Sequence, residues 1–338
     1  MLKPYLTRLL QGHDLTADET CTLLGLLTRS DISCFQAGAV LAALQMKGET
    51  AAELVGGARM LRRYGIKIHC RDPHAVDIVG TGGDGGISFN VSTTSAFIAA
   101  GAGCTVAKHG NRAVSGKSGA ADVLAECGVN IQMPPEQVEE CIDTIGIGFL
   151  FAQKLHPIMG KVAAMRRELG IQTIFNLLGP LANPAAVSHI VAGVYDASLT
   201  GLYARALMDL GTRRAMVVHG NDGLDEISCS GPTRVSEIRS GTITTYDIYP
   251  ELLIHESYPL EEIQGGTPRE NAVILKGVLS GEIRGAARAI CLLNAAAAIY
   301  VAGVAKDLQE GVLRAEESID SGKALQKLQL QIQAGRND

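Results

Sequence analysis

Long apolar runs and stretches of like charge are both missing from this 338-residue sequence. No apolar run reaches the roughly 18 to 20 residues that a membrane-spanning helix needs, and the N-terminal residues do not have the pattern of a secretory signal. The formal net charge is −5, with no basic tract, which argues against non-specific binding to nucleic acid. We therefore expect a cytoplasmic protein with no nucleic-acid partner and no membrane partner.

Cysteine pairs with CxxC spacing are also missing, although the chain has eight cysteines. Most of them lie in apolar helical or strand patterns, which indicates reduced, buried thiols and argues against a disulfide framework. Hydrophobic residues make up 46% of the sequence, enough for a substantial core. Because a single core stops growing near this chain length, we expect two domains.

The first 65 residues have the pattern of helices only. Capping boxes, in which a Ser or Thr side chain and a Glu or Gln three residues later satisfy each other's main chain, precede three apolar helical stretches: Thr16 with Glu19, Ser33 with Gln36, and Thr50 with Glu53. Gly48 and Gly65 are placed to end the second and third of these helices in the left-handed conformation. Such short helices form a thin core, so we expect them to pack against another segment or another subunit.

From residue 74 the sequence predicts alternating strands and helices. A strand at 77–79 runs into a glycine loop at 80–86, followed by a helix at 93–101 and a strand at 104–108, the pattern of a parallel α/β sheet. The alternation recurs between 189 and 219, and a β-rich stretch with a turn at Ser240–Gly241 follows. The C-terminal region returns to helix.

These patterns predict an α/β fold with a small all-helical N-terminal domain, residues 1–73, and a larger α/β domain, residues 74–338, built on a central, mainly parallel sheet. A basic helical segment at 157–170 interrupts the alternation. We expect a helical insertion near 157–185 to pack back on the N-terminal helices.

The glycine loop at 80–86 is the first motif that carries chemistry. Glycines let main-chain N–H groups approach a phosphate closely, and the loop leads to a helix N-terminus, which favours anions. Asn90, Ser92 and Thr93 add polar donors there. The alternative is a tight strand–helix turn with an ordinary helix cap. The glycine spacing matches neither a Walker loop nor a dinucleotide fingerprint.

Two further motifs also follow predicted strands. The segment 108–119 contains Lys108, Arg112 and Lys117 with several glycines and hydroxyls, a composition that suits a flexible loop closing over a polyanion. The segment 219–226 ends in Asp225–Glu226, adjacent hard carboxylates of the kind that bind Mg²⁺. A solvated basic loop and an exposed acidic turn are the alternatives. Together, the three motifs predict one site beyond the carboxyl ends of the strands.

Longer runs of residues identify a family. They are GTGGDG (80–85), FNVST (89–93), KHGNRAVSGKSGAAD (108–122), RRELGIQTIFNLLGPLANP (166–184), DGLDE (222–226), GG (265–266) with NA (271–272), and LLNAAAA (292–298). These runs span nearly the whole chain, and in this order they strongly resemble those of anthranilate phosphoribosyltransferases.

The resemblance implies a fold related to nucleoside phosphorylases and a homodimer formed through the helical domains. It implies transfer of the 5-phosphoribosyl group of 5-phosphoribosyl 1-diphosphate (PRPP) to the amino group of anthranilate, a step of tryptophan biosynthesis. It also implies Mg²⁺ as cofactor, two ions per subunit.

The family's functional positions fall on matching residues. PRPP would contact Gly80, Gly83, Asp84, Ser88, Asn90, Val91, Ser92, Thr93, Lys108, His109, Gly110, Asn111, Arg112, Ala113, Val114, Ser115, Gly116 and Ala120. Anthranilate would contact Gly80, His109, Asn111, Arg166, Gly179 and Pro180, and the metal Ser92, Asp225 and Glu226. The family usually has serine at the positions of Gly116 and Ala120, which puts two phosphate donors in doubt.

The resemblance implies catalytic roles for Lys108, Asn111 and His109. Lys108 would stabilise the departing diphosphate and Asn111 would orient the arylamine, which is neutral at pH 7 and needs no strong base. His109 would accept a proton late or serve as a wall of the site. Two rival functions share the fold: a pyrimidine nucleoside phosphorylase-like enzyme, which leaves Asp225–Glu226 and Arg166 unexplained, and a non-catalytic nucleic-acid-binding relative, which should carry a basic face.

Overall fold

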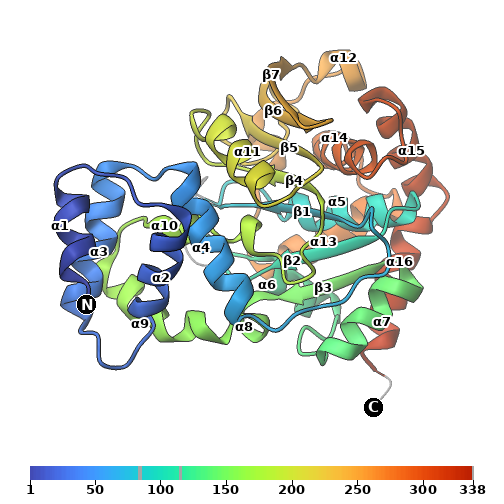
Figure 1. Ribbon diagram of the computed structural model, residues 1–338. Helices are drawn as coiled ribbons and strands as arrows, with labels where there is room; N and C mark the ends of the chain where they lie inside the picture. Colours follow the sequence, from blue (N-terminus) through green and yellow to red (C-terminus); the bar gives the residue numbers. More distant parts are fainter. Residues whose placement is uncertain (83–85, 114–115, 337–338) are drawn as a thin grey trace.

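The computed structural model describes residues 1–82, 86–113 and 116–336, and it has a small helical lobe beside a larger lobe built on a sheet (Figure 1). The helical lobe contains α1 (Lys3–Leu10), α2 (Ala17–Leu27), α3 (Cys34–Lys47) and α4 (Ala51–Tyr64). It also contains a later segment with α8 (Ala152–Leu155), η1 (Pro157–Met159), α9 (Gly160–Leu169), α10 (Ile174–Leu177) and η2 (Pro180–Ala182).

The predicted caps start α2, α3 and α4. Thr16 and Thr50 each form the complete box with the glutamate three residues later. Ser33 accepts a hydrogen bond from the main-chain N–H of Gln36 at 3.3 Å. Gly48 ends α3 with a positive φ of 85°, as predicted, but its ψ of 135° is not that of the left-handed helical conformation. The prediction for Gly65 is wrong: its φ is −79°, because the chain continues in an extended conformation, with the N–H of Ile66 donating to the carbonyl of Leu155.

The N-terminal helices share one buried core with the later segment. Leu23, Leu41, Leu44 and Leu54 belong to the same apolar cluster as residues of α9, α10 and η2: Val162, Met165, Ile174, Phe175, Leu177, Leu178 and Leu181. The cluster continues through α11 (Leu199–Asp209) to one face of the sheet. Where one domain ends and the other begins therefore stays a prediction.

Within the described residues, seven strands form one sheet in the order β3-β2-β1-β4-β5-β6-β7. The five that are parallel are β1 (Val76–Gly80), β2 (Val106–Gly110), β3 (Ile147–Phe151), β4 (His189–Gly193) and β5 (Arg214–Gly220). The antiparallel hairpin of β6 (Thr233–Arg239) and β7 (Thr242–Ile248) completes the sheet, with Ser240 and Gly241 in its turn at φ 52° and 74°. The predicted α/β fold with a mainly parallel sheet is confirmed.

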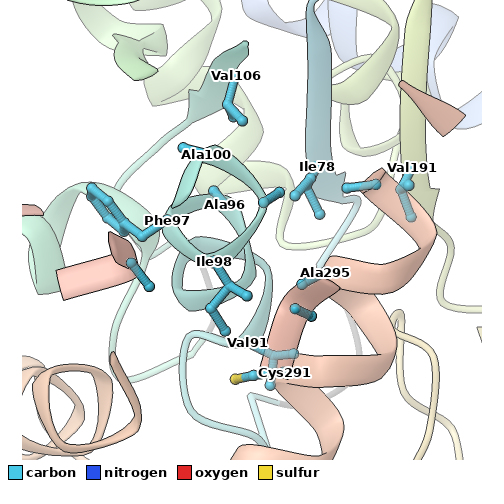
Figure 2. Packing of buried hydrophobic residues seen from close by; sticks show 14 of the residues in the cluster. Ile78, Val91, Ala96, Phe97, Ile98, Ala100, Val106, Val191, Cys291 and Ala295 are labelled. Atoms are coloured by element: carbon cyan, nitrogen blue, oxygen red, sulfur yellow. The ribbon is translucent and has the colours of Figure 1, made fainter. Parts of the chain in front are cut away.

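The second face of the sheet is covered by helices from two parts of the chain. They are α5 (Val91–Gly101), α6 (Ala120–Cys127), α13 (Pro268–Ser280), α14 (Ala286–Val301), α15 (Leu308–Asp320) and α16 (Lys323–Ala334). The helix α7 (Pro135–Ile145) packs on the first face instead, where its Val138 and Ile142 lie with Ala107 of β2 and Leu150 of β3. Figure 2 shows Ile78 and Val191 of the sheet close to Ala295 of α14, beside the buried side chains of α5. The short elements α12 (Glu251–Ile254) and η3 (Leu260–Ile263) lie between β7 and α13. No helix in the described part of the chain is both long and apolar enough to span a membrane.

The buried carboxylate of Glu53 gives a test of how α4 is held. Glu53 is fully buried and accepts hydrogen bonds from the N–H of Leu15 and from Lys47 Nζ, both at 3.0 Å. Glu53→Ala leaves both donors without that partner, so we expect the free energy of unfolding to fall by about 3 to 5 kcal/mol, measured by urea denaturation followed by circular dichroism.

Glu19→Ala is the matched control, because Glu19 has the same capping role in α2 but a partly exposed side chain. It should cost no more than about 1.5 kcal/mol. Equal losses in the two variants would contradict this account of Glu53.

Candidate active site

The described parts of three segments, 80–92, 108–120 and 222–226, meet beyond the carboxyl ends of β1, β2 and β5. The first leads from the end of β1 into α5, and the second from β2 into α6. Four of the predicted site residues, Gly83, Asp84, Val114 and Ser115, lie outside the described residues. The contacts below concern the others.

Two glycines at strand ends let the acidic segment approach the sheet. Gly80 of β1 and Gly193 of β4 are paired in the ladder. A Cβ on Gly80 would collide with the carboxylate of Asp225, and a Cβ on Gly193 with the Asp225 carbonyl. The N–H of Gly82 donates to Asp225 Oδ2 at 2.7 Å. The acidic segment therefore lies directly against the glycine loop.

The three residues predicted to bind metal lie together. Asp225 and Glu226 are each only 8% exposed, and Glu226 Oε1 accepts a hydrogen bond of 3.1 Å from the N–H of Ser92, in the first turn of α5. Their oxygens form an all-oxygen donor set, as Mg²⁺ prefers, and Mg²⁺ usually takes its remaining ligands from water and substrate phosphate. Such a small set fits this ion, although the described residues contain no cluster of three or more His, Cys, Asp or Glu.

Asn294 of α14 holds the acidic segment in place. Its Oδ1 accepts from the N–H of Ile227 and its Nδ2 donates to the carbonyl of Ile227, both at 2.9 Å. The sequence analysis contained Asn294 only within the run LLNAAAA and gave it no role. An asparagine inside a run of alanines was the available signal, because such a buried amide needs partners.

The segment after β2 is organised by Asp122 of α6. Its Oδ2 accepts from the N–H groups of Ala113 and Gly119 at 2.9 and 3.0 Å, and its Oδ1 from Arg112 at 2.6 Å. Burial alone would raise the pKa of Asp122, but these N–H groups and Arg112 outweigh it and hold the pKa below its ordinary value. The sequence analysis did not assign Asp122 a role.

Asn90 connects its own segment with the 108–120 segment and with Asn271 at the start of α13. Its Oδ1 accepts from Ser118 Oγ and from Asn271 Nδ2, both at 3.0 Å, and its Nδ2 donates to the carbonyl of Ser118 at 3.0 Å. Asn271 Oδ1 accepts from the N–H of Gly266 at 2.7 Å, which joins the GG and NA runs to the same network. Gly86 and Gly116 also approach closely, since a Cβ on Gly86 would lie 2.9 Å from the Cα of Gly116.

Lys108 lies in β2 and not in the flexible cationic loop that the sequence predicted, because β2 begins at Val106 and extends to Gly110. Its side chain is buried, and Nζ donates to the carbonyl of Ile78 at 2.6 Å. Burial lowers the pKa of Lys108, opposed by the negative charges of Asp77, Glu226 and Asp225. The negative charges around Lys108 thus favour its protonated form, near the acidic segment.

His109 faces the segment between α10 and η2. Its Nδ1 lies 3.2 Å from the carbonyl of Gly179, so this nitrogen carries the proton and Nε2 is the acceptor. Nε2 is buried and has no hydrogen-bond partner among the described residues. Burial, together with the nearby His156 and Lys108, lowers the pKa of His109 well below its ordinary value, so the ring is neutral.

Arg166 and Arg167 of α9 have different surroundings. Arg166 is half-buried, donates from Nη2 to Asn176 Oδ1 at 3.2 Å and lies over the ring of Phe175, 5.6 Å from its centre. Arg167 is exposed. Burial lowers the pKa of Arg166. Asn176 lies in α10, just before Gly179 and Pro180, so Arg166 belongs to the same wall of the site.

Comparisons with known proteins show which proteins this chain is similar to. The model of the glycosyl transferase family, a/b domain, matches residues 72–325, and the helical bundle domain of the same family matches residues 3–65. The chain is 49% identical over 328 residues to the anthranilate phosphoribosyltransferase of Symbiobacterium thermophilum, which covers 97% of this chain and 96% of that protein.

Solved structures are similar over nearly the full length. The crystal structure of anthranilate phosphoribosyltransferase from Thermus thermophilus has a TM-score of 0.92 and 40% identity, covering 98% of this chain and 99% of that one. The Saccharomyces cerevisiae enzyme in complex with PRPP and Mg has a TM-score of 0.89 and 32% identity, covering 98% and 97%. A structure of the yeast enzyme with 4-fluoroanthranilate has a TM-score of 0.88 and 30% identity, with the same coverage.

Proposed function

Since the chain belongs to the anthranilate phosphoribosyltransferase family, it is a phosphoribosyl-transferring glycosyltransferase of tryptophan biosynthesis, and we propose that its two substrates meet beyond the carboxyl ends of β1 and β2. It transfers the 5-phosphoribosyl group of PRPP to anthranilate, giving N-(5-phosphoribosyl)anthranilate and diphosphate. The observation that carries this placement is the contact of the glycine loop, the first turn of α5 and the buried Asp225–Glu226 pair.

PRPP occupies the side of the site formed by residues 80–93 and 108–120. The glycines and the N-terminus of α5 supply N–H donors for phosphate, and Asn90 and Ser118 fix the two loops against each other. The buried ammonium of Lys108 places positive charge where diphosphate leaves. Gly116 and Ala120 contribute main chain only, in place of the usual serines.

Mg²⁺ is the cofactor, held by Asp225 and Glu226 with the hydroxyl of Ser92, and we assign two ions to each subunit. When bound, the ion neutralises charge on the diphosphate leaving group. The N–H groups of Gly82 and Ser92 hold the carboxylates of Asp225 and Glu226 in place.

Anthranilate occupies the side formed by His109, Asn111, Arg166 and the Gly179–Pro180 segment, near Gly80. Arg166 pairs with the carboxylate of anthranilate. The neutral His109 offers Nε2 as an acceptor toward the amine, whose nitrogen forms the new bond to the anomeric carbon as the bond to diphosphate breaks. The amine nitrogen loses one proton as the new bond forms, and His109 Nε2 accepts it; no strong base is needed because the arylamine is already neutral.

The two rival functions have less support. A nucleoside phosphorylase function would not explain the Asp225–Glu226 pair beside Ser92 or the half-buried Arg166. A nucleic-acid-binding relative is at odds with the net charge of −5. The cytoplasm is the compartment we propose, because all eight cysteines are free thiols.

The helical lobe has an apolar stripe that suits a second copy of the chain. Phe35 is 91% exposed and Met46 is 87% exposed; with Ala39 they lie on one side of α3, and Leu10 of the adjacent α1 is also exposed. We propose that this stripe is the homodimer interface.

A fluorescence assay tests the function. Anthranilate fluorescence should fall when the protein is added with PRPP and Mg²⁺, and chelation of the metal should stop the loss.

Asp225→Asn combined with Glu226→Gln should abolish stimulation by Mg²⁺. The control is Asp222→Asn, since the Asp222 carboxylate is occupied by Ser228 and Ser230 and should leave the Mg²⁺ requirement unchanged. Normal Mg²⁺ dependence in the double variant would remove the pair from the site.

Arg166→Ala should lower kcat/KM for anthranilate about 10- to 150-fold, the effect of losing one charge-assisted hydrogen bond. The KM for PRPP should change little, because PRPP occupies the opposite side. Arg167→Ala is the matched control on the same helix and should have little effect. Steady-state kinetics with each substrate varied in turn measure both, and equal losses in the two variants would refute the placement of Arg166.

Light scattering at micromolar concentration should give about twice the chain mass of 35.5 kDa. Phe35→Asp with Met46→Asp should give the monomer mass. Leu313→Asp changes a similarly exposed apolar residue of α15 and should stay dimeric. A monomeric parent protein would refute the interface.

A further inference from the structure

The ladder between β1 and β2 stops after a single residue pair, Val76 with Val106. The neighbouring pair, β1 with β4, runs through five residues. The N–H of Val76 donates to the carbonyl of Thr105 at 2.9 Å. A parallel ladder continued in this register would pair the carbonyl of Ala107 with the N–H of Ile78, and the N–H of His109 with the carbonyl of Ile78.

Side chains take the places of these missing ladder bonds. The N–H of His109 donates to Asp77 Oδ1 at 3.0 Å. The carbonyl of Ile78 accepts from Lys108 Nζ at 2.6 Å, and the carbonyl of Ala107 from Asn183 Nδ2 at 2.9 Å. The two strands can therefore separate toward the site without leaving these buried main-chain groups unpaired.

Asp77 and His109 also belong to a closed ring of contacts with the segment that precedes β4. Asp77 Oδ2 accepts from Asn183 Nδ2 at 2.7 Å. Asn183 follows η2, which begins directly after Gly179, and the carbonyl of Gly179 contacts His109 Nδ1 at 3.2 Å. The ring thus runs from Asp77 to Asn183, along η2 to Gly179, and back through His109 to Asp77.

Burial of the Asp77 carboxylate at this position costs free energy of desolvation. It is fully buried, and burial raises its pKa to about 6, although Lys108, Asn183 and main-chain N–H groups act in the opposite direction. An apolar side chain would avoid this desolvation but could accept neither of the two hydrogen bonds. A carboxylate is suited to joining two donors from different segments.

We propose that Asp77 is a positioning residue for anthranilate, which sets the spacing between His109 and the Gly179–Pro180 wall by accepting from both His109 and Asn183. This role rests on the proposed function, because it concerns the side of the site assigned to anthranilate. Asp77 touches neither substrate. Its effect should fall on use of anthranilate and spare the binding of PRPP.

Asp77→Asn tests the role with little change in size. An amide has one acceptor oxygen where two donors face the side chain, so one contact of the ring is lost. We expect kcat/KM for anthranilate to fall about tenfold or more in Asp77→Asn and in Asn183→Ala. The KM for PRPP is compared in Asn183→Ala, because that variant keeps the Asp77 charge that supports the protonated form of Lys108, and it should stay within about threefold of the parent value.

A role limited to stabilising the fold would give a different pattern. Unchanged kcat/KM in a folded Asp77→Asn variant would overturn the proposal, as would equal losses for both substrates in Asn183→Ala. If Asp77→Asn does not fold, Asn183→Ala replaces it, because it opens the ring and leaves the Asp77–His109 contact in place. That variant should show the same loss for anthranilate alone, and parent-like kinetics would overturn the proposal. Failure of the parent protein to consume anthranilate would instead refute the proposed function.

Discussion

The site depends on the early termination of the hydrogen-bond ladder between β1 and β2. Because β1 and β2 pair only at Val76 and Val106, the two strands can supply different segments to the site, the glycine loop from one and the 108–120 segment from the other. The separation would leave buried main-chain groups unpaired if Asp77, Lys108 and Asn183 did not bind them. Three polar side chains in the interior thus make the opening compatible with a folded sheet.

The same opening separates two electrostatic environments. On one side, Asp225 and Glu226 lie near the buried ammonium of Lys108, an arrangement suited to a metal ion and a polyanion. On the other side, His109 is neutral because burial and nearby positive charges lower its pKa. A neutral acceptor suits an uncharged amine, and in the proposed arrangement the carboxylate of anthranilate pairs with Arg166. In that arrangement the two substrates meet where the two environments adjoin, as displacement at the anomeric carbon requires.

Sequence reasoning succeeded where the determining contacts are local. The boxes of Thr16 and Thr50 and the turn at Ser240–Gly241 depend on neighbours within three residues, and the structure has them as predicted. It failed for β3, whose residues Ile147–Phe151 are all buried, because a short apolar run without alternation does not distinguish strand from helix. Asp77 looked like part of a strand, and its partner Asn183 lies 106 residues away. The family runs contained Asp122 and Asn294, but only the structure shows which main-chain groups these side chains bind.

A crystal structure of the chain with PRPP and Mg²⁺ would test the central claim most directly. The account predicts diphosphate between residues 80–93 and 108–120, metal in contact with Asp225 or Glu226, and the anomeric carbon of the ribose directed toward His109. It also predicts that Asp77 still accepts from His109 and Asn183 in the complex. Diphosphate bound away from these two segments, or a β1–β2 ladder closed by direct main-chain bonds beyond Val76, would contradict it.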